Sequence, residues 1–155
     1  MFERMFAPEV MEEAFAILVE EMPLALWETA YATILATLFA VILGLPLGVL
    51  LVAGERNGVL PLPGWLLKGI NVVVNLLRSV PFLILMIMVI PLTRLIVGTM
   101  VGTVASIVPL VIAAFPFIAR LVESSLREVD ANIIEAAQSM GASPCQIILQ
   151  VMLPE

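Results

Sequence analysis

Long apolar runs alternate with short polar segments along this 155-residue chain. Residues 27–53 carry one charge, Glu28, which lies near their edge, and residues 103–119 carry none. About 20 apolar residues are enough for a helix to cross the hydrocarbon core of a bilayer. The pattern therefore predicts a transmembrane helix in each of these two stretches, with Pro109 and Pro116 as points where the later one can bend.

The middle of the chain, residues 65–97, is too long for one straight span and too short for two. As a single helix it would measure about 50 Å, against a hydrocarbon core of about 30 Å. We predict an elbow at the inner membrane surface over residues 65–75, where polar residues interrupt the apolar pattern, and then a span over residues 76–97. Pro81 should bend this span near its inner end. The glycine-containing residues 98–102 then predict an outer turn.

The first segment of the chain is amphipathic and acidic. Pro8 can head a helix that carries apolar residues on one face and glutamates mostly on the other, and that ends near Pro23. An acidic face fits poorly with the anionic cytoplasmic leaflet, so we expect residues 1–26 to form an external segment at the outer membrane surface. The chain opens without the basic start and apolar run of a secretory signal, which predicts no cleaved signal.

The inner end of the first span contains two glycines that flank a proline. Gly44 and Gly48 permit the close approach of another helix, and Pro46 permits a kink. We interpret both glycines as packing residues rather than as part of a transport site. Residues 54–64 consist largely of turn formers and predict a short polar loop.

Polar residues return near the C-terminal end, where two short helices are expected. Asn132 and Glu135 stand in the spacing of a capping box, which predicts a helix that starts at about residue 133 and ends at Gly141. The apolar residues Ile133, Ala137 and Met140 share one face of it, which suits docking against another protein.

A second start signal follows directly. Ser143 can cap a helix that has Pro144 in its first position and Gln146 three residues after the cap. Pro154 should break or kink this helix.

The amino-acid composition also indicates an integral membrane protein, and it excludes several kinds of catalytic and binding site. Hydrophobic residues make up 62% of the chain and charged residues 13%, so we expect an all-α integral membrane bundle. No basic cluster is present for nucleic acid. The single cysteine excludes an internal disulfide, and the absence of histidine excludes the usual zinc-hydrolase and Ser-His-Asp sites. These residue types predict neither a metal site nor a cofactor, and they argue against an enzyme.

The distribution of basic residues sets the expected orientation. If the first span runs inward, five of the seven lysines and arginines lie inside and only Arg4 and Arg94 lie outside. Arg120, Glu123 and Arg127 would then bring the chain into water on the inner side. The positive-inside rule thus predicts an external N-terminus, three crossings, and a cytoplasmic location for residues 120–150, within a coupling loop of about residues 120–154.

The cytoplasmic segment resembles the EAA loop of ATP-binding-cassette importer permeases. That loop reads Glu-Ala-Ala, three residues, Gly, nine residues, Ile, one residue, Leu-Pro, and this chain differs from it only by Val151 in place of Ile. The segment Arg78 to Phe82 also resembles the Arg-x-x-Pro segment of the second core helix in these importers. The amino-acid sequences of residues 75–82 and 114–123 are most similar to those of methionine-importer permeases.

The resemblance implies a bacterial inner-membrane subunit of an ATP-driven importer, with residues 27–155 forming an incomplete transmembrane domain. Such permeases are homodimers of five-helix subunits, served by two cytoplasmic ATPase subunits and an external substrate-binding protein. This chain stops at the start of what would be the fourth helix, so we expect a fragment or a truncated product. Carried over position by position, the ATPase-coupling residues are Glu135, Ala136, Ala137, Met140, Gly141, Leu153 and Pro154.

Two other functions remain open at this stage. A small membrane scaffold or assembly protein could use the same loop for docking without transporting anything, and co-purification of a nucleotide-hydrolysing subunit would separate the two. An intramembrane enzyme is disfavoured because the chain lacks histidine and paired intramembrane acids. In the permease interpretation, closure of the ATPase on ATP moves the helix at residues 132–141 as a rigid body.

Overall fold

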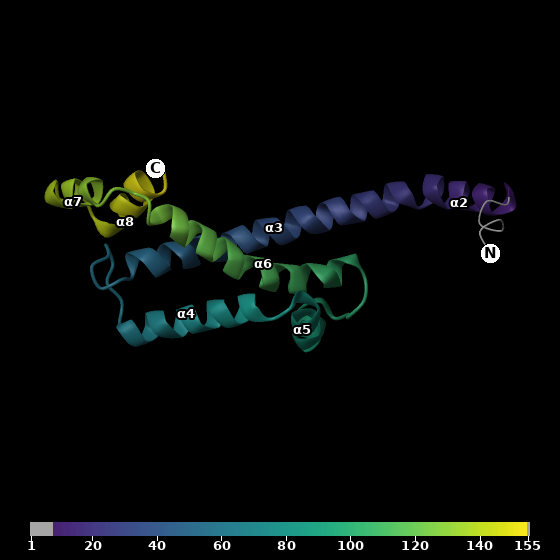
Figure 1. Cartoon of the computed structure of the whole chain (residues 1–155), viewed down its shortest axis with the longest axis horizontal. Coiled ribbons are helices and arrows are strands. Elements are labelled where there is room, and N and C mark those ends of the chain that lie inside the picture. The colour runs from purple at the N-terminus through teal and green to yellow at the C-terminus, as the bar shows by residue number, and fades with distance from the viewer. Residues whose placement is uncertain (1–7, 155) are drawn as a thin grey trace.

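The computed structural model describes residues 8–154, and all regular elements in that range are helical. Figure 1 shows an elongated arrangement in which α7 and α8 lie at the end of the molecule opposite α2. In chain order the elements are α2 (Pro8–Glu20), α3 (Met22–Ala53), α4 (Gly64–Ser79), α5 (Phe82–Val97), α6 (Thr103–Leu126), α7 (Ala131–Ser139), α8 (Pro144–Ile147) and the π-helix η1 (Ile148–Met152).

Helices α3 and α6 form the most extensive helix pair. Their close approach is made by small residues at every fourth position of α3, from Ala32 through Ala36 and Ala40 to Gly44 and Gly48, all of which are buried. A Cβ atom added at Gly44 would lie 2.8 Å from the carbonyl oxygen of Phe115, and one at Gly48 would lie 2.6 Å from that of Ala119. The packing role predicted for these glycines is therefore confirmed.

The N-terminal helix meets the first span with almost no break. Helix α2 ends at Glu20, and α3 begins at Met22 with Pro23 in its first turn. Figure 1 shows α2 continuing roughly along the direction of α3. Pro23 was expected to end the amphipathic helix, but it instead heads the next one, because the first helical turn has no need of its N–H.

The predicted span over residues 76–97 is wrong as a single helix. Helix α4 ends at Ser79, α5 starts at Phe82, and the two axes are bent by 115°. Pro81 lacks an N–H and forces Val80 into an extended conformation with ψ 128°, so the helix stops instead of bending. The expected elbow over residues 65–75 is also not a separate element, because it continues without interruption to Ser79.

Within the described residues, two helices are long and apolar enough to cross a membrane by themselves, namely α3 and α6. The broken pair of α4 and α5 passes the same test only when it is taken together, so the predicted three spans are reached if this pair counts as one. Gly98 and Gly102 have φ angles of 82° and 108° and make the predicted turn into α6. Pro109 and Pro116 lie inside α6, which stays helical as far as Leu126.

Candidate functional site

Helix α7 is capped at its N-terminus by a residue other than the predicted one. Asp130 is the N-cap, and its Oδ1 accepts hydrogen bonds from the backbone N–H and the side-chain Nδ2 of Asn132 at 2.9 Å and 2.8 Å. The capping box predicted between Asn132 and Glu135 is therefore wrong. The aspartate takes the cap two residues earlier and starts the helix at Ala131, so Glu135 is no longer three residues from the cap.

The end of α7 agrees with the prediction. Gly141 has a φ of 82°, and its N–H donates to the carbonyl of Gln138 at 2.9 Å, while the N–H of Ala142 donates to that of Ala137 at 3.1 Å. These bonds satisfy carbonyls that the last helical turn leaves free. The helix is nine residues long, a short rigid element rather than a span.

The second start signal is also confirmed. The N–H of Ser143 donates to Oε1 of Gln146 at 2.9 Å, and the N–H of Gln146 donates to Oγ of Ser143 at 3.4 Å. After one α-helical turn the chain widens into the π-helix η1, where the N–H of Leu153 donates to the carbonyl of Ile148 at 3.0 Å. Helical structure ends at Met152, two residues before Pro154, as predicted.

A buried apolar cluster attaches this C-terminal unit to the ends of the long helices. Its buried members are Leu126 from α6, Ala137 from α7, Ile147 from α8 and Met152 from η1, and partly buried residues of α3 such as Val52 pack against them. Ala137 is only 5% exposed. Its assignment to an exposed docking face is therefore corrected, because its methyl group packs against residues of its own chain.

The surface that α7 leaves free is carried by other residues. Ile133, Ala136 and Met140 follow one another at spacings of three and four residues, and all three side chains are exposed; we call them the outer face of α7. Glu135 is also exposed. Of the residues named from the sequence, Glu135, Ala136 and Met140 thus remain available to a partner, whereas Gly141 acts through the backbone.

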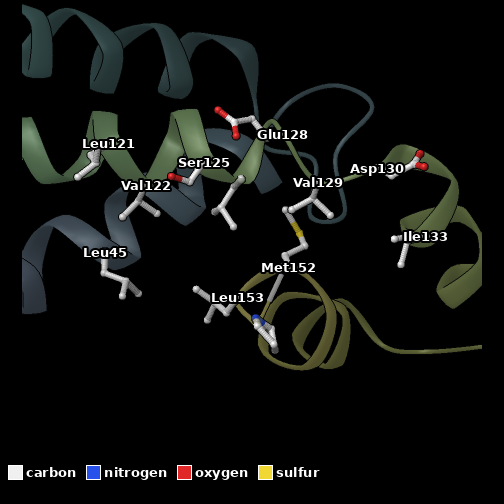
Figure 2. Close-up of a pocket in the computed structure, with 12 residues that line it drawn as sticks. Leu45, Leu121, Val122, Ser125, Glu128, Val129, Asp130, Ile133, Met152 and Leu153 are labelled. Atoms are coloured by element: carbon white, nitrogen blue, oxygen red, sulfur yellow. The ribbon is translucent and has the colours of Figure 1, made fainter.

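Leu153 and Pro154 lie in a groove of about 790 Å³ between the end of α6, the start of α7 and η1, and Ile133 of the outer face also lines this groove. Figure 2 shows Leu45 and Val122 toward one end of this groove, Ile133 toward the other, and Met152 and Leu153 approaching from η1. The complete lining is Leu45, Leu121, Val122, Ser125, Leu126, Glu128, Val129, Asp130, Ile133, Met152, Leu153 and Pro154.

An ion-pair network lies next to the apolar cluster. Glu123 is 8% exposed and accepts from Arg120 and, at 2.9 Å, from Nη2 of Arg127. Nη2 of Arg127 also donates to Glu55 at 2.5 Å, in the loop that follows α3. Hydrogen bonds with Glu55, and then with Glu123, raise the pKa of Arg127 above its ordinary value, so its charge is secure at any physiological pH.

From the sequence, the charges at the end of α6 predict only that the chain enters water there. The structure corrects this for Glu123, which faces inward because α6 continues as a helix to Leu126. The spacing of three and four residues among Arg120, Glu123 and Arg127 was the signal for the pairing within α6. Glu55 lies 72 residues from Arg127, and nothing local pointed to it.

Comparisons with known proteins agree with this architecture. Residues 44–155 match the family described as binding-protein-dependent transport system inner membrane component. The probable D-methionine transport system permease protein MetI of Vibrio cholerae serotype O1 is 51% identical over 142 residues, which cover 91% of this chain and 62% of that protein. The D-methionine transport system permease protein MetI of Escherichia coli (strain K12) is 46% identical over 129 residues, covering 83% of this chain and 59% of that protein.

Solved structures give the same result. The permease fold of the MetNI methionine ABC transporter, in an inward-facing conformation, matches with a TM-score of 0.83 at 42% identity, covering 92% of this chain and 64% of that chain. The chain therefore spans about 60% of the length of the curated relatives it matches. The family match includes α4 to η1, the C-terminal end of α3 and every candidate coupling residue. The chain belongs to the family of binding-protein-dependent transport system inner membrane components.

Proposed function

We propose that this chain is the membrane-spanning part of an ATP-driven importer for methionine or a close relative of methionine. The support for the substrate is similarity alone, since the relatives that match at 46–51% identity are named as D-methionine transport permeases. ATP hydrolysis would belong to two cytoplasmic ATPase subunits. A second copy of the permease and an external substrate-binding protein would complete the assembly.

The coupling role is supported by the way α7 is attached to the rest of the chain. One side of this helix is fixed by Ala137 to the buried cluster, and the outer face with Ile133, Ala136 and Met140 stays exposed. A short helix held in this way can be pushed as a rigid body by a partner that has an apolar groove. Leu126 and Val52 would pass that displacement to the ends of α6 and α3.

The ATPase acts on such a permease only by preferring one of its conformations. Contacts made to α7 in one state and lost in the other shift the population between inward-facing and outward-facing forms. The free energy available for the shift is the difference between those two sets of contacts, so every residue of the outer face that changes its environment contributes to coupling.

The proposed orientation places the N-terminus and residues 1–26 outside and α7, α8 and η1 in the cytoplasm. The Lys/Arg count supports this orientation. Two contacts support a common direction for the long helices: Glu55 meets Arg127 at one end, and Oγ1 of Thr103 donates to Glu28 at 2.7 Å at the other. On this proposal residues 27–155 form the transmembrane domain, and residues 120–154 form the coupling loop.

The test uses two matched substitutions at the C-terminal end of α7, one in its last turn and one at its C-cap. Met140→Glu places a carboxylate on the outer face, and Gln138→Glu places the same group on another exposed side of the helix. Both should be equally abundant in the membrane, because both side chains are exposed. Pull-down of the ATPase and methionine-dependent ATP hydrolysis should be lost with Met140→Glu and retained with Gln138→Glu. Equal retention of the ATPase by both variants would refute the docking role. The substrate is tested separately by uptake of labelled methionine, and uptake that excess unlabelled methionine leaves unchanged would refute it.

A further inference from the structure

Helix α4 carries a continuous polar face. Lys68, Asn71, Asn75 and Arg78 follow one another at spacings of three, four and three residues, which places them on one side of the helix. Of these four side chains only Asn71 is half-buried; the other three are exposed. We call these four residues the polar face of α4.

The other sides of α4 are apolar and have different environments. Val74 is buried at 1% exposure and, with the half-buried Ile70, turns toward α3 and α6. Val72 and Leu76, in contrast, are 56% and 60% exposed and fit contact with lipid tails. The helix therefore presents one core side, one lipid side and one polar side.

The polar face is joined to α6 at its centre. Nη2 of Arg120 donates to Oδ1 of Asn71 at 2.6 Å and to Oδ1 of Asn75 at 3.0 Å. The charge of Arg120 is offset by its pairing with Glu123. Within residues 8–154, however, neither Lys68 nor Arg78 has an ion-pair partner, so the polar face carries a net positive charge.

The polar face leads to the break between α4 and α5. A cavity of about 290 Å³ lies there, and Arg78, Val80 and Phe82 are part of its lining. Non-helical backbone at membrane depth is tolerated where it is buried in protein or lines water, and charged side chains within spans face a bundle interior or a water-filled cavity. The break and the polar face are two separate features of the same stretch, and both fit a protein interior or a water-filled cavity better than lipid.

We propose that the polar face of α4 lines the water-filled path of the permease and that its positive charge attracts the carboxylate of the transported solute. This proposal rests on the proposed transport function. An amino acid crosses the membrane with its carboxylate ionised, and Lys68 and Arg78 supply compensating charge at either end of the face. The two asparagines, held by Arg120, present amide groups between them.

The experiment is cysteine accessibility in the permease assembled with its ATPase in membranes and carrying Cys145→Ser. Single cysteines replace Asn75 and Arg78 on the polar face, and Val72 and Leu76 serve as controls within the same turns. A charged, membrane-impermeant thiol reagent should modify the polar-face cysteines at least about tenfold faster than the controls, because hydrocarbon excludes the reagent. Saturating methionine should slow modification, whereas methioninol, which lacks the carboxylate, should not.

Each alternative result is decisive. Equal rates at Asn75 and Leu76 would overturn the assignment of the path. Unreactive polar-face cysteines that cross-link two copies on oxidation would place this face in a subunit contact and also overturn it. If methioninol protected the cysteines as well as methionine does, the proposed attraction of the solute carboxylate would be wrong. The relative rates measured without methionine depend neither on uptake nor on the identity of the solute, so equal rates at Asn75 and Leu76 are distinguishable from a failure of the proposed function.

Discussion

Arg127 donates a hydrogen bond from Nη2 to Oε1 of Glu55 at 2.5 Å, which joins the end of α6 to the loop after α3 across 72 residues of sequence. Both side chains are about half exposed, at 48% and 47%. Exposed pairs of this kind contribute about 0–1 kcal/mol to stability. The same guanidinium also reaches Glu123, whose side chain is only 10% exposed, and this second contact has the larger consequence.

Glu123→Gln should destabilise the fold by about 1–3 kcal/mol. The substitution removes the carboxylate that pairs with both Arg120 and Arg127, at a buried position where water cannot replace it. Thermal unfolding of the purified permease in detergent measures the loss. Glu55→Gln should change the unfolding temperature much less. If Glu55→Gln proved the more damaging of the two, the burial argument for Glu123 would be wrong.

Gly48→Ala should weaken the packing of α3 on α6 by about 1–3 kcal/mol, because the new Cβ would lie 2.6 Å from the carbonyl oxygen of Ala119 and 2.7 Å from Val122. Gly69→Ala is the matched control, since a Cβ there meets nothing within 4 Å. The control should gain about 0.5–1 kcal/mol from better helix propensity. We expect the unfolding temperature to fall in Gly48→Ala and to rise in Gly69→Ala, relative to the parent protein. A Gly48→Ala variant that is more stable than the parent would contradict the close helix contact.

Two acidic residues, Asp130 at the N-cap of α7 and Glu135 in the middle of the helix, give a second matched set. Asp130→Ala removes the side chain that caps the helix and should cost about 0.5–2 kcal/mol of local stability, whereas Glu135→Ala removes no cap and should cost little. Hydrogen exchange of the α7 amides reports the difference. Faster exchange after Glu135→Ala than after Asp130→Ala would restore the capping box that the structure excludes.

Gly141→Val should loosen the junction between α7 and α8, because a β-branched residue is strained at a φ of 82°. The expected result is normal membrane insertion with faster proteolysis near residue 141 and weaker attachment of the ATPase. Gly64→Ala is a suitable control, since that glycine has open space and is not a positive-φ residue. Unchanged proteolysis of Gly141→Val would show that the turn tolerates side chains.

Orientation is tested by cysteine labelling in the Cys145→Ser background. Single cysteines at Gly58, Thr99 and Ser143 lie in the loop after α3, in the turn before α6 and at the start of α8. Only the cysteine at Thr99 should react with an impermeant reagent added from outside, as the Lys/Arg count requires. Labelling at Gly58 or Ser143 from outside would reverse the proposed topology.

The sequence by itself determined the features that depend on a few neighbouring residues. Ser143 with Gln146 predicted a capping box, Gly141 predicted a left-handed helix end, and Gly44 with Gly48 predicted close helix packing; all three are confirmed. Long apolar runs placed α3 and α6, because chain length and hydropathy alone decide whether a helix can span a bilayer.

Only the tertiary structure decided which side of each helix is covered. Ala137 and Met140 share an apolar face in sequence, yet α8 and η1 cover the first and leave the second exposed. Likewise, Pro81 predicted a bend, but only the tertiary structure shows a break of 115° between α4 and α5, with both helices in contact with α6. Periodicity reveals that a face is apolar or polar, whereas the choice of its neighbour is made by contacts distant in sequence, as between Arg120 and Asn71.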